Sequence, residues 1–221
     1  MDEKLLFEVI TTFCELPNGD RDVLKTPYDG GDGYIYGTNG KVFIAVPKEL
    51  LPTKGQMPER PSKAIMKVVK FAQDADFEIP LKELFKRLKK HPGDERCPEC
   101  KGKKQVTWTY FADDGSYMKQ GDCPVCNGTG LAGGNPHTIV PGTDKPVNEL
   151  ACVKIKHGGV YASFFAPVIA IVANGAHLLG RTALHVVRFS ETGCMLVTLP
   201  DGIFIGGMPC VNQVPDEVME L

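Results

Sequence analysis

The sequence lacks long apolar runs, a basic amino-terminus and an excess of positive charge. No stretch approaches the roughly 20 apolar residues that a membrane-spanning helix needs, and Asp2 and Glu3 are acidic where a secretory signal is basic. We therefore expect a cytoplasmic protein with reduced thiols and no membrane partner. The formal net charge of −2 excludes a generally basic nucleic-acid coat, so any nucleic-acid contact must come from a local patch.

Several enzyme signatures are also missing. There is no G-x-S-x-G nucleophile motif, and no G-x-x-x-x-G-K-[ST] phosphate loop. No H-x-E precedes the P-C-x-x-C segments as it does in zinc deaminases. The glycines between Gly30 and Gly33 are accordingly predicted to form a turn. These absences favour a non-enzymatic protein.

Two C-x-x-C pairs, each followed by a glycine two residues later, are the strongest signal in the chain. In C-x-x-C the backbone curls so that both sulfur atoms face one point, and two such knuckles supply the four ligands of a closed zinc site. The predicted Zn²⁺ ligands are Cys97, Cys100, Cys123 and Cys126. Disulfides or a chance spacing are the alternatives. The other cysteines are expected to be small buried hydrophobic residues; they are Cys14, Cys152, Cys194 and Cys210.

The knuckles resemble the C-x-x-C-x-G-x-G repeats of the DnaJ cysteine-rich zinc module. Residues 123–130 match that repeat fully, whereas Lys104 replaces the last glycine of the copy that begins at Cys97. The family has four repeats and two zinc ions, so two repeats imply one site here. The J-domain His-Pro-Asp motif is absent, and the resemblance does not imply a co-chaperone.

The sequence between the knuckles predicts a β-hairpin. Residues 105–111 alternate β-branched and aromatic side chains, and an Asp-Gly turn precedes residues 116–120. Trp108 and Tyr110 fall on one face and can stack on bases, while nearby lysines can hold phosphates. Those lysines are Lys101, Lys103, Lys104 and Lys119. Alternatively, the single tryptophan only covers a small module that has no core of its own.

Residues 61–91 form the one sizeable positive region, with eight Lys or Arg against four Asp or Glu. We expect two helices here, over 61–71 and along the apolar stripe of 81–88. The candidate nucleic-acid or partner-binding side chains are Lys82, Lys86, Arg87, Lys89 and Lys90. The alternative is a helix face that is merely solvated.

Segments on both sides of the zinc module predict hairpins and a few helices. Residues 34–46 and 152–163 contain Asn-Gly and Gly-Gly turns, and residues 166–174 suit a helix that ends at Gly175. Residues 5–13 fit a helix or a strand equally well. Three more strands are expected over 184–189, 195–199 and 203–205, followed by an acidic tail from 215 to 221.

The expected fold class is therefore α+β, with antiparallel hairpins, a few helices and an inserted zinc-ribbon hairpin. We expect residues 1–94 and 132–221 to form one discontinuous domain and residues 95–131 to form the zinc-binding module.

A strand, a helix and three strands follow residue 150, with a partial echo before residue 95. The segments 39–44 and 201–205 are also alike. This order resembles the half-domain of sliding-clamp proteins, and the chain has a general likeness to small phage proteins that carry a four-cysteine zinc insertion. The resemblance implies an accessory factor that binds nucleic acid or a protein of DNA metabolism.

Two other functions stay open on the sequence. The order His137, Asn148, His157 is similar to that of HNH nucleases, which often contain C-x-x-C zinc sites. Against this, Thr138 separates His137 from Ile139, both C-x-x-C pairs lie upstream, and the last histidine falls in a predicted hairpin instead of a helix. The third possibility is a DnaJ-like module that binds substrate proteins.

Overall fold

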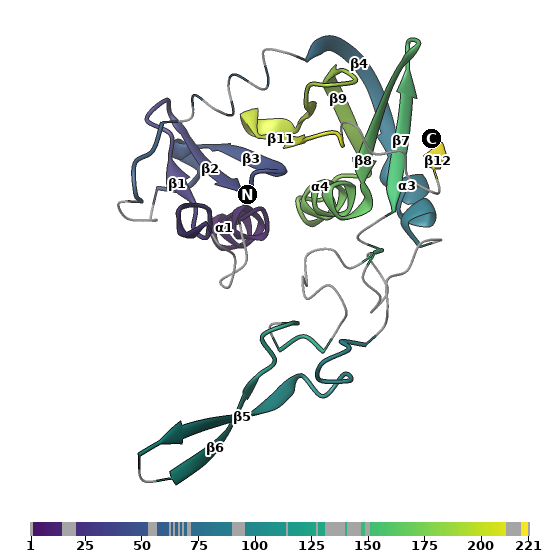
Figure 1. Ribbon diagram of the computed structural model, residues 1–221. Helices are drawn as coiled ribbons and strands as arrows, with labels where there is room; N and C mark the ends of the chain where they lie inside the picture. The colour runs from purple at the N-terminus through teal and green to yellow at the C-terminus, as the bar shows by residue number, and fades with distance from the viewer. Residues whose placement is uncertain are drawn as a thin grey trace.

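A seven-stranded antiparallel sheet is the largest element of the structure (Figure 1). The structure is a computed structural model, and it describes residues 2–14, 21–52, 57–61, 63, 65, 67, 69, 72–89, 96–113, 115–126, 128–130, 140, 147–148, 151–210 and 218–220. In spatial order the strands are β1 (Tyr28–Asp29), β2 (Tyr34–Thr38), β3 (Val42–Pro47), β11 (Phe204–Gly207), β10 (Met195–Thr198), β9 (Ala183–Phe189) and β4 (Gln73–Pro80). Strands from both sides of the zinc segment thus share one sheet.

Three α-helices, α1 (Glu3–Thr12), α3 (Leu81–Leu88) and α4 (Ala166–Leu178), are described. They lie along one face of the sheet, with α4 between the other two (Figure 1). Alternate sheet residues, such as Ile44 and Ile205, pack with these helices in one large apolar core. The expected α+β class is confirmed.

Residues 5–13, whose sequence fits a helix or a strand equally well, fall mostly within helix α1. Asp2 caps it, because its carboxylate accepts a hydrogen bond from the Lys4 backbone N–H at 2.9 Å. The buried residues Leu6, Val9 and Ile10 form one stripe along the helix. Packing of that stripe on the sheet resolves the ambiguity.

Helix α4 continues past Gly175 to Leu178, so the prediction that it ends at Gly175 is wrong. A Cβ atom at Gly175 would lie 2.7 Å from the Phe13 ring. The glycine therefore makes room for an aromatic side chain beside α1 instead of terminating the helix.

The strand order is symmetrical about the β3–β11 pair. The unit α1-β1-β2-β3 supplies one half of the first six strands and α4-β9-β10-β11 supplies the other half. The two similar sequence segments end in β3 and β11, which pair antiparallel with Ile44 opposite Ile205. The two alike segments thus occupy equivalent places.

A second sheet has the order β12-β7-β8, where β7 is Cys152–His157, β8 is Val160–Phe165 and β12 is Val218–Glu220. The β7–β8 hairpin was expected. The tail was not expected to contain a strand, but β12 pairs parallel with β7. Two of its three residues, Val218 and Met219, are apolar, so the acidic residues of the tail did not prevent this short pairing with the edge of β7.

Strand β4 is also absent from the sequence-based expectations. Its residues are mostly exposed, since it lies at the edge of the sheet and pairs only with β9. In the neighbouring segment that was predicted to be helical, the described residues are helical; they are Lys63, Ile65, Lys67 and Val69. The described part of the body also contains the short 3₁₀ turns η1 (Asp22–Leu24), η2 (Lys48–Leu50) and η4 (Pro200–Gly202).

The predicted zinc hairpin consists of β5 (Gln105–Ala112) and β6 (Gly115–Asp122). In Figure 1 it extends away from the sheets and helices, which we call the body. Residues 96–130, which contain the hairpin and both knuckles, are called the module below. None of the helices in the described residues combines the length and apolar character needed to cross a bilayer.

The four cysteines of the body were expected to be isolated, buried hydrophobic residues, and only some of them are. Cys14, Cys152 and Cys194 are buried, as expected, whereas Cys210 is half-buried. The Sγ atoms of Cys152 and Cys210 are 3.6 Å apart, so these two residues form a pair of thiols and do not stand alone. Burial raises the pKa of the Cys152 thiol to about 12, and the nearby Cys210 sulfur contributes to the rise.

Candidate metal centre and nucleic-acid interface

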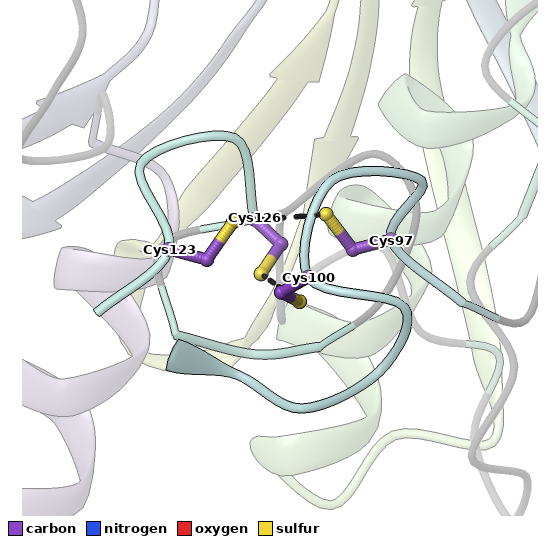
Figure 2. Close-up of side chains that lie close together, drawn as sticks. All are labelled: Cys97, Cys100, Cys123 and Cys126. Atoms are coloured by element: carbon purple, nitrogen blue, oxygen red, sulfur yellow. Dashed lines mark hydrogen bonds between the residues drawn. The ribbon is translucent and has the colours of Figure 1, made fainter. Parts of the chain in front are cut away.

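Four cysteine side chains converge at the base of the β5–β6 hairpin (Figure 2). Their sulfur atoms all lie within 4.8 Å of one another, and all four residues are buried. The Sγ–Sγ distances are 3.8 Å for Cys97–Cys123 and 3.7 Å for Cys100–Cys126. A tetrahedral zinc ion with bonds of about 2.3 Å places its sulfur ligands about 3.8 Å apart. The four side chains are thus compatible with a zinc site, and the disulfide alternative is wrong because all four thiols are free.

Protons compete with any metal at this site. Burial raises the pKa of the Cys97 thiol to about 11. A zinc ion binds thiolates, so it must displace protons from the cysteines, and its affinity falls as the pH falls. The cysteines and Val106 make up the whole buried cluster of the described part of the module. The module therefore has almost no apolar core.

The two knuckles close on each other through matching backbone hydrogen bonds. The Cys97 N–H donates to the Gly130 carbonyl at 2.9 Å, and the Cys123 N–H donates to the Lys104 carbonyl at 2.8 Å. Lys104 (φ 67°) and Gly130 (φ 79°) both adopt the left-handed conformation. The lysine thus occupies a glycine position of the repeat, at a cost of roughly 1–2 kcal/mol.

Three aromatic rings and one lysine share a face of the hairpin. Trp108 lies opposite Lys119 and Tyr110 lies opposite Tyr117, and directly opposed residues project to the same side. The tyrosine rings are stacked, with centroids 5.3 Å apart and an interplanar angle of 17°. Trp108 lies over Gly121, where a Cβ atom would be 3.3 Å from the indole Cδ1. We call Trp108, Tyr110, Tyr117 and Lys119 the aromatic strip.

The other face of the hairpin is uncovered as well. Phe111 and Met118 are 84% and 76% exposed, and within the strip Tyr110 is 54% and Trp108 49% exposed. The expectation that Trp108 covers the module is met only over Gly121, because about half of its surface remains open. Apolar surface concentrated in this way on a projecting element indicates a binding role.

Tyr117 was not among the predicted binding residues, although the hairpin register places it opposite Tyr110. Counted outward from the predicted Asp-Gly turn, Tyr117 falls opposite Ala112, on the same face as Tyr110 but not directly opposite it. The knuckle lysines are exposed, as expected; they are Lys101, Lys103 and Lys104.

Lys82, Lys86 and Arg87 lie on α3 in the body and Lys89 caps its carboxyl end; α3 packs against α4. Lys82, Lys86 and Lys89 are exposed. Glu83 partly neutralises this face, because it accepts a hydrogen bond from Arg87 Nε at 3.1 Å and lies 3.9 Å from Lys86 Nζ. Lys90 is outside the described residues. Figure 1 places α3 and the hairpin in different parts of the molecule, and we treat them as two surfaces.

The histidines of the nuclease interpretation are not brought together in the described structure. The His157 ring stacks on Phe77, with centroids 4.0 Å apart and an interplanar angle of 11°. His157 lies in β7, a strand, whereas the nuclease interpretation needs a helix there. His137 is outside the described residues, and Asn148 lies just before the second sheet.

The face of the large sheet that points away from α4 carries an apolar hollow that was not predicted. Its volume is about 180 Å³. It is lined by Tyr34, Tyr36, Phe43, Ala45, Ile65, Val69, Leu196 and Phe204. Because these residues come from four strands and the segment around Ile65, no local pattern in the sequence could reveal the hollow.

The comparisons with known proteins show a similarity of fold. No protein-family model matches the chain, and no curated protein sequence matches it significantly. The resemblance of the knuckles to DnaJ therefore stays a prediction. Solved structures with a similar fold are sliding clamps of bacterial DNA polymerase III.

A Bartonella birtlesii sliding clamp bound to griselimycin has a TM-score of 0.50 and 10% identity, over 95% of this chain and 64% of the clamp. A Caulobacter crescentus clamp has a TM-score of 0.48 and 10% identity, over 95% of this chain and 64% of the clamp. A Helicobacter pylori clamp bound to a DNA ligase peptide has a TM-score of 0.45 and 12% identity, over 94% of this chain and 62% of the clamp. The chain thus spans less than two thirds of the length of these clamps. The Bartonella comparison supports a clamp-like α+β fold.

Proposed function

We propose that this protein is a non-enzymatic, zinc-binding accessory factor of DNA metabolism with a clamp-like body. The observation that carries the proposal is the arrangement of the sheet with α1, α3 and α4, which matches a DNA polymerase III clamp over 95% of the chain at a TM-score of 0.50. Fold alone does not fix function. The chemistry of the exposed surfaces therefore has to supply the rest.

The proposed DNA contact of the body is the exposed face of α3. Lys82, Lys86 and Lys89 project from this helix, and ammonium groups that neutralise phosphates release counterions from DNA. The ion pair between Arg87 and Glu83 cancels one positive charge of the helix. We accordingly expect weak, sequence-independent binding of duplex DNA that declines steeply with salt.

The proposed role of zinc is structural. Four thiolates fill a tetrahedral zinc ion and leave no open position for a substrate or a water molecule. Cys97 and Cys123 would hold one side of the ion and Cys100 and Cys126 the other. Zinc would then fix the two knuckles from which the hairpin projects, and it would not take part in a reaction.

A protein partner has its own candidate surface. The apolar hollow on the outer face of the sheet is lined only by apolar and aromatic residues, and such hollows accept the apolar anchors of bound peptides. A peptide from a protein of DNA metabolism is the second kind of partner that we propose. The hollow lies on the face opposite α3, so both partners could be held at once.

The test is binding of a labelled duplex by fluorescence anisotropy at two salt concentrations. The variant Lys82→Glu with Lys86→Glu is compared with Lys63→Glu plus Lys67→Glu, which makes the same charge change. Lys63 and Lys67 are exposed, and their neighbours Ile65 and Val69 pack on the outer face of the sheet.

The variant Lys82→Glu with Lys86→Glu should lose most of the duplex affinity at low salt. The slope of log affinity against log salt concentration should become about two units less steep. The control pair should bind like wild type. No duplex binding by wild type at low salt, or equal losses in both variants, would refute the α3 surface as a DNA contact.

A further inference from the structure

The aromatic strip carries one cation and no anion. Residues that share this face of the hairpin alternate along both strands, and they are Val106, Trp108, Tyr110, Ala112, Gly115, Tyr117, Lys119 and Gly121. The acidic residues Asp113 and Asp122 lie at the tip and at the base of the hairpin. A surface of rings with a single ammonium group suits a polyanion with flat, apolar parts.

The rings present their surfaces to solvent at a spacing that suits bases. Trp108 and Tyr110 are two residues apart on one strand, hence about 6.8 Å apart along it. This is about twice the 3.4 Å separation of stacked bases, so each ring has room for a base of its own. In the Tyr110–Tyr117 stack each ring covers one face of the other, so a base stacks on an outer face of the pair.

We propose that the aromatic strip binds single-stranded nucleic acid, with bases stacked on Trp108 and on the Tyr110–Tyr117 pair and a phosphate held by Lys119. Inside a duplex the faces of the bases are covered by neighbouring base pairs and cannot stack on the aromatic strip. The strip is therefore expected to select single strands. Every base has a π-face, so binding tolerates many sequences. The strip is separate from the duplex contact proposed on α3, and each can fail without the other.

Stacking outweighs charge at this site. A zinc ion held by four thiolates would carry a net charge of −2, which the knuckle lysines Lys101, Lys103 and Lys104 would offset. Only Lys119 lies on the strip itself. We therefore expect binding that depends weakly on salt, with a slope near one, in contrast to the steeper dependence expected for α3.

The chain contains a single tryptophan, and it lies in the strip. Quenching of intrinsic tryptophan fluorescence by an unlabelled oligothymidine of about 20 nucleotides thus reports directly on this site. Affinity is measured in parallel by anisotropy of the labelled oligomer, using the full-length, zinc-loaded chain. We expect saturable quenching by the single strand and little quenching by a duplex.

Tyr110→Ala is the principal variant, because Tyr110 lies toward the tip, away from the knuckles. Loss of one stacked base corresponds to about 1–3 kcal/mol, hence a loss of affinity of about 5- to 150-fold. Phe111→Ala is the matched control, since this more exposed ring lies on the opposite face. It should bind the oligomer like wild type. Zinc content is measured for both variants to confirm an intact module.

Other results would overturn the proposal. Absence of quenching by the oligomer at low salt would do so, as would equal losses in Tyr110→Ala and Phe111→Ala. Those outcomes would identify the hairpin as an apolar docking element for a protein. The charge variant on α3, Lys82→Glu with Lys86→Glu, should leave oligothymidine binding unchanged; a parallel loss would place the single-strand site on the body and refute the strip.

Discussion

The body and the module bury side chains of different kinds. In the body, aliphatic and aromatic residues from both sheets and all three described helices share one core, with Phe164, Leu84 and Ile169 fully buried. In the described part of the module the buried side chains are those of the four cysteines, while its aromatic rings are largely exposed. Stability in the first region comes from apolar area removed from water, whereas in the second we propose that it depends on a zinc ion bound by the four cysteines. The following variants separate the two regions.

The largest effect is expected from removing a zinc ligand. Cys100→Ser should lose zinc and unfold the knuckles, because structural zinc sites contribute about 10–16 kcal/mol to the folding of small zinc modules. Metal analysis should fall from about one zinc ion per chain to none, and the Trp108 emission should change. Thermal unfolding of the body should stay the same.

Cys210→Ser is the matched control, since this half-buried cysteine lies in the body, and it should retain zinc. Full zinc content in Cys100→Ser would contradict the assignment. A deletion variant, in which a short Gly/Ser linker replaces residues 96–131, tests the independence of the body. It should keep a cooperative transition if residues 1–94 and 132–221 form the single discontinuous domain that we propose.

A truncation in the core should produce the opposite pattern. Phe164→Ala removes a fully buried ring from β8 and should lower the free energy of unfolding by about 3–5 kcal/mol, with zinc content unchanged. The measurement is chemical denaturation followed by circular dichroism. Tyr161→Ala, on the same strand but 40% exposed, should cost less than about 1 kcal/mol. Similar costs for the two variants would show that β8 is not part of the core.

An added methyl group tests how closely α1 approaches the sheet. A Cβ atom at Gly37 would lie 2.3 Å from the Ile10 carbonyl oxygen. Gly37→Ala should therefore lower the free energy of unfolding by about 1–3 kcal/mol. Thr11→Ala, on the exposed side of α1, should have little effect. A neutral Gly37→Ala would mean that α1 sits farther from β2 in solution.

The smallest expected effect is a gain in the module. Lys104→Gly relieves the left-handed backbone at φ 67° and should raise zinc affinity about fivefold, corresponding to about 1 kcal/mol. Lys103→Gly removes the same charge without relieving a positive φ, and it should lower the affinity slightly. Competition with a chromogenic chelator measures both. Equal changes in the two variants would mean that charge, not conformation, controls affinity.

The convergence of the four cysteines and the hairpins could be predicted because their signals are local. The cysteine spacing and the turns at Asn39-Gly40 and Asp113 lie within a few residues of the structure that they specify. Strand β4 was missed because its residues are mostly exposed and it depends on pairing with β9. The outer hollow was missed because it is assembled from distant strands. Gly175 was misinterpreted because its partner Phe13 belongs to the other end of the chain.

The symmetrical strand order also bears on how the chain folds as it is synthesised. β3 pairs with β11, and the facing residues Ile44 and Ile205 are separated by most of the sequence. At about 5–20 residues per second, β11 leaves the ribosome roughly 10–30 s after β3. During that interval the edge of β3 that later meets β11 has no strand to pair with, whereas the intervening cysteines are already available to bind the proposed zinc ion. If they bind it then, the module is complete before the body, although the body begins to emerge first.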